Sequence, residues 1–188
     1  MNRFILAHAL CFCALKVIAQ SSDTTVEKSI WNVQTGLLGV YVNNEYRLSN
    51  AFALRTEVGL DAGFTAKAND TKWGLIPTIN IEPRYYYNLA KRAEKGRNTS
   101  GNAANFFTIL FKYNADWFVI SSEDNVITEN MIAVIPKWGI RRNIGKSKFN
   151  YEAGIGIGYY NYFGSDRKYY SNPENVAVDL HLRIGYRF

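Results

Sequence analysis

The feature that most constrains this chain is a two-residue alternation in its last segment. Every second residue from 176 to 188 is apolar, namely Val176, Val178, Leu180, Leu182, Ile184, Tyr186 and Phe188. The residues between them include Asp179, His181, Arg183 and Arg187. Because successive side chains point to opposite faces of a β-strand, the pattern predicts a long strand with one apolar and one charged face.

Six upstream segments show the same alternation, and all are long for strands. They cover 38–48, 52–62, 75–87, 109–119, 132–141 and 149–160. Strands of soluble domains are usually about 5 to 6 residues long, whereas a tilted membrane-spanning strand needs about 9 to 11. Since bacterial single-chain barrels have even strand numbers, we expect an eighth strand at 26–33, followed by a turn at 34–36.

The predicted fold class is therefore all-β: a closed, antiparallel, up-and-down transmembrane β-barrel of eight strands. Such a barrel pairs every backbone N–H and C=O group without leaving a sheet edge, which the hydrocarbon of a membrane requires. Aromatic residues make up 15% of the chain, which fits aromatic belts at the two membrane interfaces. The alternative is a secreted β-sandwich, in which the apolar faces pack on a second sheet and the charged faces meet water.

Residues 1–19 are predicted to be a secretory signal peptide, and residues 20–188 the barrel domain. Arg3 gives a positive start, 4–15 form a short apolar run, and Ala19 precedes the expected cleavage site. The run is too short for a membrane-spanning helix, which needs about 20 residues. Cys11 and Cys13 both lie in this segment, and the residues before them are not the small ones of a lipoprotein signal. The mature chain is therefore expected to carry no thiol or disulfide chemistry.

The charged faces of the predicted strands define a lattice of acids and bases inside the barrel. Its acids are Glu45, Glu57, Asp61, Glu82, Asp116, Glu152 and Asp179, and its bases are Arg47, Arg55, Arg84, Lys112, Lys137, Arg141, Arg183 and Arg187, with His181 beside them. An isolated charge in a water-poor interior costs several kcal/mol, so the nearly equal numbers predict mutual ion pairs. The interior of an eight-stranded barrel is just wide enough for side chains to fill. We therefore favour a filled, structural interior over a gated or selective pore.

Counting the strands back from a periplasmic C-terminus assigns each connection to one side. The outer side receives the predicted loops 65–72, 121–130 and 164–175, and the periplasmic side the turns 49–50 and 143–146 and the segment 88–104. That last segment includes a predicted helical turn near 89–95 and carries Lys91, Arg92, Lys95 and Arg97. These charges are either solvated or in contact with phospholipid headgroups or an anionic periplasmic partner.

No constellation in the sequence predicts a catalytic, cofactor or metal site. His181 is the single histidine after residue 19, and a Ser-His-acid hydrolase needs a serine beside it, but the predicted inward faces carry none. One histidine without cysteines does not supply the usual zinc ligands. The glycine run at 154–158 lacks the third-glycine spacing of a dinucleotide site. Basic residues alternate along the strands instead of forming a patch, which disfavours nucleic acid as a partner.

Two stretches resemble small outer-membrane β-barrel proteins of Gram-negative bacteria, notably the Bacteroidetes-type outer-membrane β-barrel domain. The stretch 178–188 is similar to the terminal-aromatic signal read by the barrel-assembly machinery, with Leu182, Ile184, Tyr186 and Phe188 as its apolar residues. The stretch 39–63, with its turn at 45–50, is similar to a barrel hairpin of that family. The resemblance implies export by the signal peptide, insertion in the outer membrane, and contact with phospholipid, lipopolysaccharide and the assembly machinery. It also implies an eight-stranded barrel, and it implies no shared enzymatic activity.

These features predict an integral outer-membrane barrel with a structural role, or a role in binding an extracellular or periplasmic partner. Two alternatives remain open. The first is a lipid A-modifying enzyme of the deacylase kind, whose activity would depend on His181. The second is a small porin.

Overall fold

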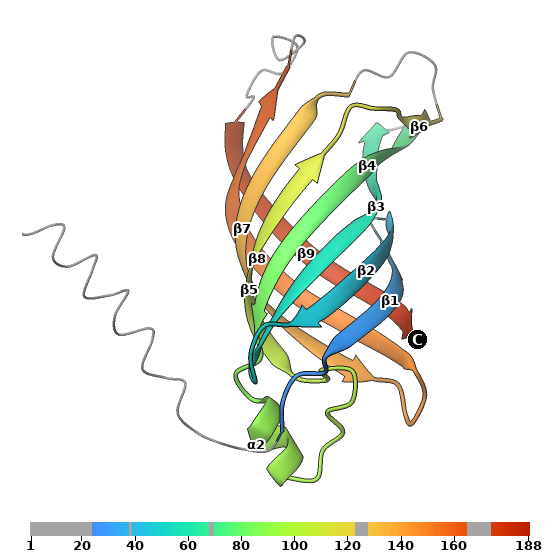
Figure 1. Ribbon diagram of the computed structural model, residues 1–188. Coiled ribbons are helices and arrows are strands. Elements are labelled where there is room, and N and C mark those ends of the chain that lie inside the picture. Colours follow the sequence, from blue (N-terminus) through green and yellow to red (C-terminus); the bar gives the residue numbers. More distant parts are fainter. Residues whose placement is uncertain (1–23, 38, 68–69, 123–127, 165–173) are drawn as a thin grey trace, which may run out of the picture.

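The computed structural model describes residues 24–37, 39–67, 70–122, 128–164 and 174–188 (Figure 1). Its elements in chain order are β1 (Ser29–Gly36), β2 (Gly39–Arg47), β3 (Phe52–Lys67), β4 (Asp70–Tyr85), α2 (Leu89–Glu94), β5 (Asn105–Asn114), β6 (Ile120–Ser121), β7 (Asn130–Asn143), β8 (Phe149–Phe163) and β9 (Glu174–Arg187). The predicted signal peptide, its cleavage site and both cysteines lie outside the described residues.

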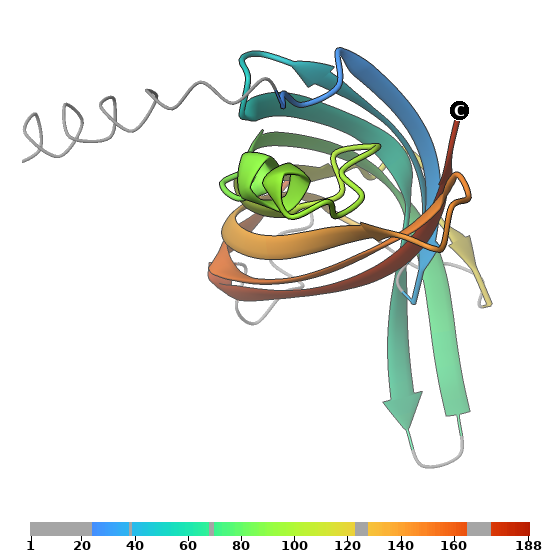
Figure 2. The same ribbon diagram turned by 90° about the horizontal axis from the view of Figure 1, so that it is seen from below.

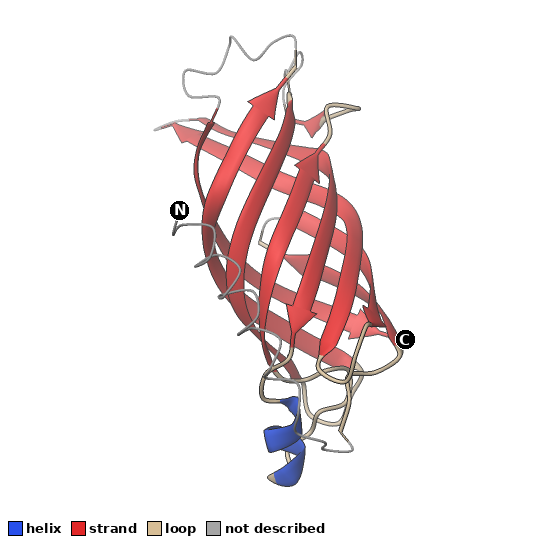
Figure 3. Cartoon of the chain, turned by 60° about the vertical axis from the view of Figure 1, so that its left-hand side comes forward, coloured by secondary structure: helices blue, strands red, loops and turns tan. Residues whose placement is uncertain are grey.

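The strands form one closed antiparallel barrel. Each long strand pairs with the next long strand in the chain, and β1 pairs with β9 from Asn32↔Arg187 to Gly36↔Arg183, which closes the cylinder. The short β6 pairs with β4 and extends one rim. The prediction of an eight-stranded, all-β, antiparallel barrel is confirmed (Figure 3), and a sandwich of two facing sheets is excluded.

The segment between β4 and β5 lies across one opening of the barrel (Figure 2). Within it, α2 begins at Leu89 and ends at Glu94, which confirms the helical turn predicted near 89–95. An apolar cluster packs inside this opening and consists of Val26, Ala53, Tyr86, Leu89, Ala104 and Phe106. We call this opening the α2 end of the barrel and the opposite opening the far end.

The first strand lies later in the chain than predicted. β1 runs from Ser29 to Gly36, so the turn predicted at 34–36 is wrong. Gln34 is fully buried, whereas its neighbour Val33 is exposed, so the alternation continues through this residue. What looks like a break in the apolar pattern is a polar side chain pointing inward. The reversal comes after Gly36, which pairs with Gly39, whose φ of 137° suits glycine.

Two further predictions of strand ends are wrong. β3 extends to Lys67 and β4 begins at Asp70, so most of the predicted loop 65–72 is paired strand. The predicted strand 109–119 ends at Asn114, and pairing with β4 resumes only at Leu75↔Ile120. The last pair of β5 with β4 is Thr78↔Asn114. More residues lie between Asn114 and Ile120 than between Leu75 and Thr78, so the chain bulges between β5 and β6. The connections predicted near 49–50 and 143–146 do lie between β2 and β3 and between β7 and β8.

The barrel has a charged interior and an apolar exterior. The guanidinium of Arg55 and the carboxylate of Glu152 lie inside and are fully buried. On the outside, Leu180 is 66% exposed and Val178 is 64% exposed. The period-two pattern of the sequence therefore separates the two faces as expected, with the ionic face enclosed.

Candidate functional site

The interior brings thirteen of the sixteen predicted lattice residues together in ion pairs. They come from every long strand of the barrel except β1, and they are Glu45, Arg55, Glu57, Asp61, Glu82, Arg84, Lys112, Lys137, Arg141, Glu152, Asp179, His181 and Arg183. Counting without the histidine, six carboxylates face six basic side chains. This balance leaves the paired part of the interior without net charge.

Glu152 is the centre of this network. Its carboxylate accepts hydrogen bonds from Arg55 Nη1 at 2.9 Å, from Arg84 Nη1 at 3.0 Å and from Arg141 Nε at 2.6 Å. The strand register places Arg141 of β7 directly beside it, while Arg55 and Arg84 reach it from β3 and β4. Charge-assisted, multiply bonded contacts of this kind are the strongest hydrogen bonds in proteins. One carboxylate thus joins three cations across the barrel.

Glu45 connects the network to the segment that covers the α2 end. It accepts hydrogen bonds from Arg141 Nη2 at 3.0 Å, from the Tyr86 hydroxyl at 2.9 Å and from Asn102 Nδ2 at 2.5 Å. Arg141 also donates to the carbonyl oxygen of Gly101 at 3.1 Å. Asn102 has a left-handed backbone with φ of 57°, which asparagine tolerates better than most residues. The segment 95–104 is therefore held from inside the barrel.

Glu57 forms a second centre nearer the far end. Its carboxylate pairs with Arg55 and with Arg183, whose Nη1 lies 2.8 Å from Oε2, and it accepts a hydrogen bond from Asn80 Nδ2 at 2.9 Å. The Arg183 guanidinium also lies over the ring of Tyr41, 3.7 Å from its centroid. Arg183 is therefore fixed both by a carboxylate and by a cation–π contact.

His181 is part of a row of four polar side chains. The Lys137 ammonium lies 2.9 Å from Asp179 Oδ1 and 3.0 Å from His181 Nδ1, and His181 Nε2 lies 3.1 Å from Glu152 Oε2. Since an ammonium group only donates, Nδ1 accepts and Nε2 carries the hydrogen toward Glu152. Both ring nitrogens are therefore engaged by charged neighbours.

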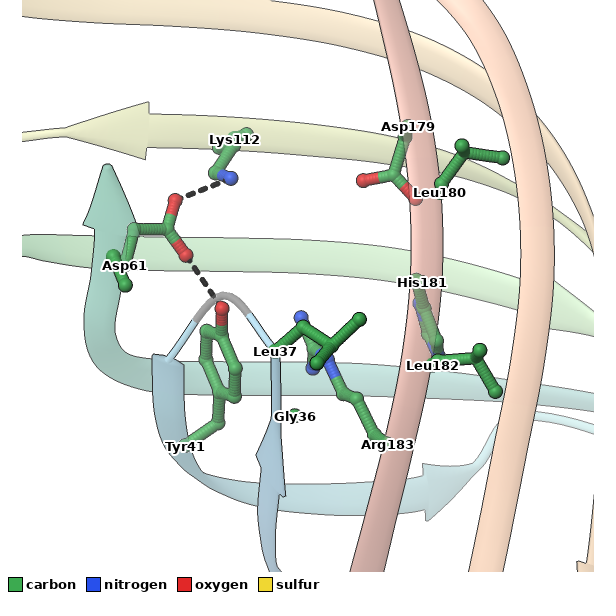
Figure 4. A pocket seen from close by; sticks show the side chains of 11 residues that line it. Gly36, Leu37, Tyr41, Asp61, Lys112, Asp179, Leu180, His181, Leu182 and Arg183 are labelled. Carbon is green, nitrogen blue, oxygen red and sulfur yellow. Dashed lines mark hydrogen bonds and ion pairs between the residues drawn. The ribbon is translucent and has the colours of Figure 1, made fainter. Parts of the chain in front are cut away.

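A cavity of about 360 Å³ lies between this row and the far end (Figure 4). Its polar walls are formed by Tyr41, Asp61, Lys112, His181 and Arg183, with Asp179 above His181 on β9. Asp61 accepts a hydrogen bond of 2.7 Å from the Tyr41 hydroxyl and forms an ion pair with Lys112. The cavity is large enough for a small polar molecule, but its charges already neutralise one another.

Three predicted lattice residues lie outside the network. Asp116 is exposed in the bulge after β5 and accepts a hydrogen bond of 2.6 Å from Asn130 Nδ2. Its predicted inward position is wrong, because the strand ends at Asn114 and the alternation no longer applies. Arg47 and Arg187 are half-buried at the α2 end, and among the described residues Arg47 Nε and Arg187 Nη1 find no hydrogen-bond partner.

The sequence pattern did not identify the neutral polar groups that complete the network. Gln34 accepts a hydrogen bond of 2.6 Å from Arg55 Nη2, and Tyr86 and Asn102 serve Glu45. The alternation does predict that the side chain of Tyr86 points inward, but it does not predict the hydrogen bond of Tyr86 to Glu45. Asn102 lies in a connection, and no periodic signal marks it.

The outside of the barrel carries a ring of aromatic side chains at the α2 end. Every long strand contributes at least one, and together they are Trp31, Tyr46, Phe52, Tyr85, Phe107, Trp138, Phe149, Tyr151 and Tyr186. Adjacent members touch: Phe52 stacks on Tyr85 with ring centroids 4.7 Å apart, and Phe149 meets Tyr186 at 5.0 Å. We call this set the aromatic ring.

A second group of aromatic residues lies near the far end, and on β8 aliphatic residues separate the two groups. The second group contains Trp73, Tyr113, Trp117, Phe118, Tyr159 and Phe163. On β8, the exposed residues between Tyr151 and Tyr159 are Ile155 and Ile157. The four residues predicted to form the assembly signal, Leu182, Ile184, Tyr186 and Phe188, are all exposed on the outer face of β9 and at its end.

No helix in the described part of the chain combines the length and the apolar character needed to cross a membrane. Among the same residues, no group of three or more His, Cys, Asp or Glu side chains is arranged to hold a metal ion.

The site and the fold together define a closed eight-stranded β-barrel with an ion-paired interior and an apolar, aromatic-ringed exterior. Comparisons with protein-family models, with curated proteins and with solved structures found no match for this chain. The resemblance to small outer-membrane barrels therefore stays a prediction from the sequence.

Proposed function

We propose that this chain is an integral outer-membrane β-barrel that acts as a structural or binding protein and that its interior does not conduct ions. One observation carries the proposal: the apolar and ionic side chains are on the opposite sides from those of a protein in water. Arg84 and Glu152 are fully buried, whereas Leu180 and Leu182 are more than 60% exposed. Burying one such leucine gains about 1.5 to 3 kcal/mol, so a whole exposed face of them favours an apolar solvent.

The aromatic ring supports the same proposal. Tyrosine and tryptophan are enriched at both membrane interfaces, where one part of the side chain is apolar and the other is hydrated. Between Tyr151 and Tyr159, β8 rises by about 20 Å if it is tilted as in known barrels, close to their apolar band of about 25 Å. The spacing of the two aromatic groups therefore fits the thickness of an outer membrane.

Orientation follows from the C-terminal end of the barrel. Phe188 lies at the α2 end, which we place in the periplasm, and the cavity lined by Asp61 and Lys112 then opens toward the outside. Outer-membrane phospholipid and lipopolysaccharide are the partners proposed for the exterior. The barrel-assembly machinery is the partner proposed for the exposed residues of β9 during insertion.

The filled cross-section at Glu152 favours a closed interior over the porin alternative. Arg55, Arg84 and Arg141 converge on one carboxylate, and each of these four side chains is at most 2% exposed. The contacts of His181 also favour a structural role over the deacylase alternative. A general base needs a ring nitrogen free to accept a proton from the nucleophile, and here Nδ1 and Nε2 face Lys137 and Glu152.

The first test is location and folding in cells that express the full chain. We expect the protein in the outer-membrane fraction, with faster gel migration before heating than after it. Recovery in the soluble periplasmic fraction without a heat-dependent shift would contradict the membrane proposal.

The second test addresses the role of the interior. We expect no unitary conductance steps in planar bilayers and no change in the lipid A mass spectrum of expressing cells. Regular conductance steps would support the porin, and a loss of acyl chains from lipid A would support the enzyme.

A further inference from the structure

The periplasmic segment presents a group of cations that differs from those of the interior. A cavity of about 420 Å³ lies between α2 and the end of β4, and it is lined by Tyr87, Asn88, Lys91, Arg92, Lys95 and Arg97. Four of these six side chains are basic and none is acidic. We call this the basic cavity.

The cations of the basic cavity meet no carboxylate among the residues that the structure describes. Within the described residues, Lys91, Arg92, Lys95 and Arg97 form no ion pair, and neither does the nearby Arg142 of β7. The interior shows the opposite arrangement, where every cation of the network meets an acid. Within the described part of the chain, the basic cavity therefore holds positive charge that no ion pair compensates.

The two best-fixed guanidinium groups of this region are held by neutral groups. Arg92 donates from Nε to the carbonyl oxygen of Ala103 at 2.8 Å, and Arg142 donates to the carbonyl oxygen of Arg141 at 2.6 Å. These bonds fix the cations in place without neutralising them. Burial, followed by the charge of Arg97, lowers the pKa of Arg92, so a bound anion would relieve an unfavourable local potential.

The basic cavity adjoins the aromatic ring through Tyr87. The ring of Tyr87 meets that of Phe107, with centroids 5.2 Å apart, and its hydroxyl accepts hydrogen bonds from Trp138 Nε1 at 3.0 Å and Asn105 Nδ2 at 2.9 Å. In the part of the chain that the structure describes, the hydroxyl hydrogen of Tyr87 has no acceptor. Tyr87 thus belongs both to the lining of the basic cavity and to the aromatic contacts beside it.

We propose that the basic cavity binds the phosphate of an anionic phospholipid in the inner leaflet of the outer membrane. This inference rests on the proposed function, because a bilayer around the barrel puts the aromatic ring at headgroup depth. Lys91, Lys95 and Arg97 would contact the phosphate, with the Tyr87 hydroxyl as a further donor. Basic clusters beside a membrane favour anionic lipids in this way. The continuity with the apolar exterior favours a lipid over a free anion, because the acyl chains can leave along the barrel wall.

The test compares lipid binding by two double variants that lose the same charge at the same end. K95Q/R97Q removes two cations of the basic cavity, and K146Q/K148Q removes two exposed lysines of the β7–β8 connection. Arg92 is left unchanged because it holds the segment together. Each protein is purified in a neutral detergent, checked for heat-dependent gel migration, and titrated with phosphatidylglycerol or phosphatidylcholine while native mass spectrometry counts bound lipid.

We expect wild type and K146Q/K148Q to retain phosphatidylglycerol with equal affinity, and K95Q/R97Q to bind it about tenfold or more weakly. Phosphatidylcholine is expected to bind weakly to all three proteins. An equal loss of phosphatidylglycerol affinity in both double variants would overturn the proposal, because it would indicate nonspecific attraction between the lipid and the positive charge of this end. Unchanged phosphatidylglycerol affinity in K95Q/R97Q would also overturn it.

Two competition experiments distinguish a lipid phosphate from other anions as the ligand of the basic cavity. Displacement of phosphatidylglycerol by an equimolar amount of inorganic phosphate would show a free-phosphate site, and displacement by an acidic muropeptide would show a cell-wall site; either result overturns the lipid proposal. Failure of the membrane proposal itself is a different observation, since wild type would then show no heat-dependent migration in the same gels.

Discussion

The substitution Glu152→Gln tests whether the interior is a dry, mutually compensated network. Glutamine keeps the shape of the side chain and removes the charge that Arg55, Arg84 and Arg141 share at 2.6 to 3.0 Å. Removing one partner of a buried ion pair typically costs about 3 to 5 kcal/mol, because the other charge stays buried. The three costs do not add up here, since each arginine retains a second carboxylate in Glu57, Glu82 or Glu45. We therefore expect E152Q to lower the free energy of unfolding by about 3 to 4 kcal/mol.

The assay is urea unfolding of the barrel refolded in phospholipid vesicles, followed by tryptophan fluorescence and by the heat-dependent gel shift. E94Q is the matched control, because Glu94 is an exposed acid at the end of α2. Exposed charges away from such features usually change stability by less than about 0.5 kcal/mol. A loss below about 1 kcal/mol for E152Q would refute the reasoning, since it would mean that water screens these charges in the folded barrel.

Three other substitutions test other parts of the structure. V178R places a charge within the apolar band, between its middle and the far end, and is expected to cost about 1 to 3 kcal/mol in vesicles, against little for I144R in the β7–β8 connection. H181N removes the link between Lys137 and Glu152 and is expected to cost about 1 to 3 kcal/mol while the lipid A mass spectrum stays unchanged. G139V is expected to cost about 1 to 3 kcal/mol, because a Cβ at this position lies 2.5 Å from Cζ of Phe106. Each cost is read from the urea midpoint of the refolded protein. Equal effects of V178R and I144R would contradict the lipid-facing assignment, and a change of lipid A that disappears in H181N would contradict a structural histidine. Wild-type stability of G139V would contradict the close contact of β7 with Phe106.

The strands were predictable from the sequence because their signal is local. An apolar residue at every second position is enough to define a strand and its two faces, and β9 shows this from Val176 to Tyr186. The same rule failed where polar residues continue a strand. It missed the inward Gln34 in β1, and it read the paired residues at the ends of β3 and β4 as a loop. The bulge at 115–119 also escaped it, since an apolar stretch looks the same whether or not its backbone is paired.

The composition of the interior network was largely predictable, but its connections were not. Alternation places a side chain inside the barrel without saying what it meets there. Arg55 and Glu152 are 97 residues apart, and their contact depends on the closure of the whole cylinder. Asn102, which completes the contacts of Glu45, comes from a connection whose path over the α2 end follows from no local pattern.

The shared carboxylate at position 152 also has a consequence for how such a barrel changes over evolutionary time. Since three guanidinium groups share it, a neutral exchange at this one position would deprive each of them of one carboxylate partner. An acid introduced in place of any one of the three arginines would set a second buried carboxylate against Glu152. In related sequences, positions 55, 84, 141 and 152 should therefore change together. Position 152 should covary with positions 55 and 84, which are distant in the chain, more strongly than with its own sequence neighbours.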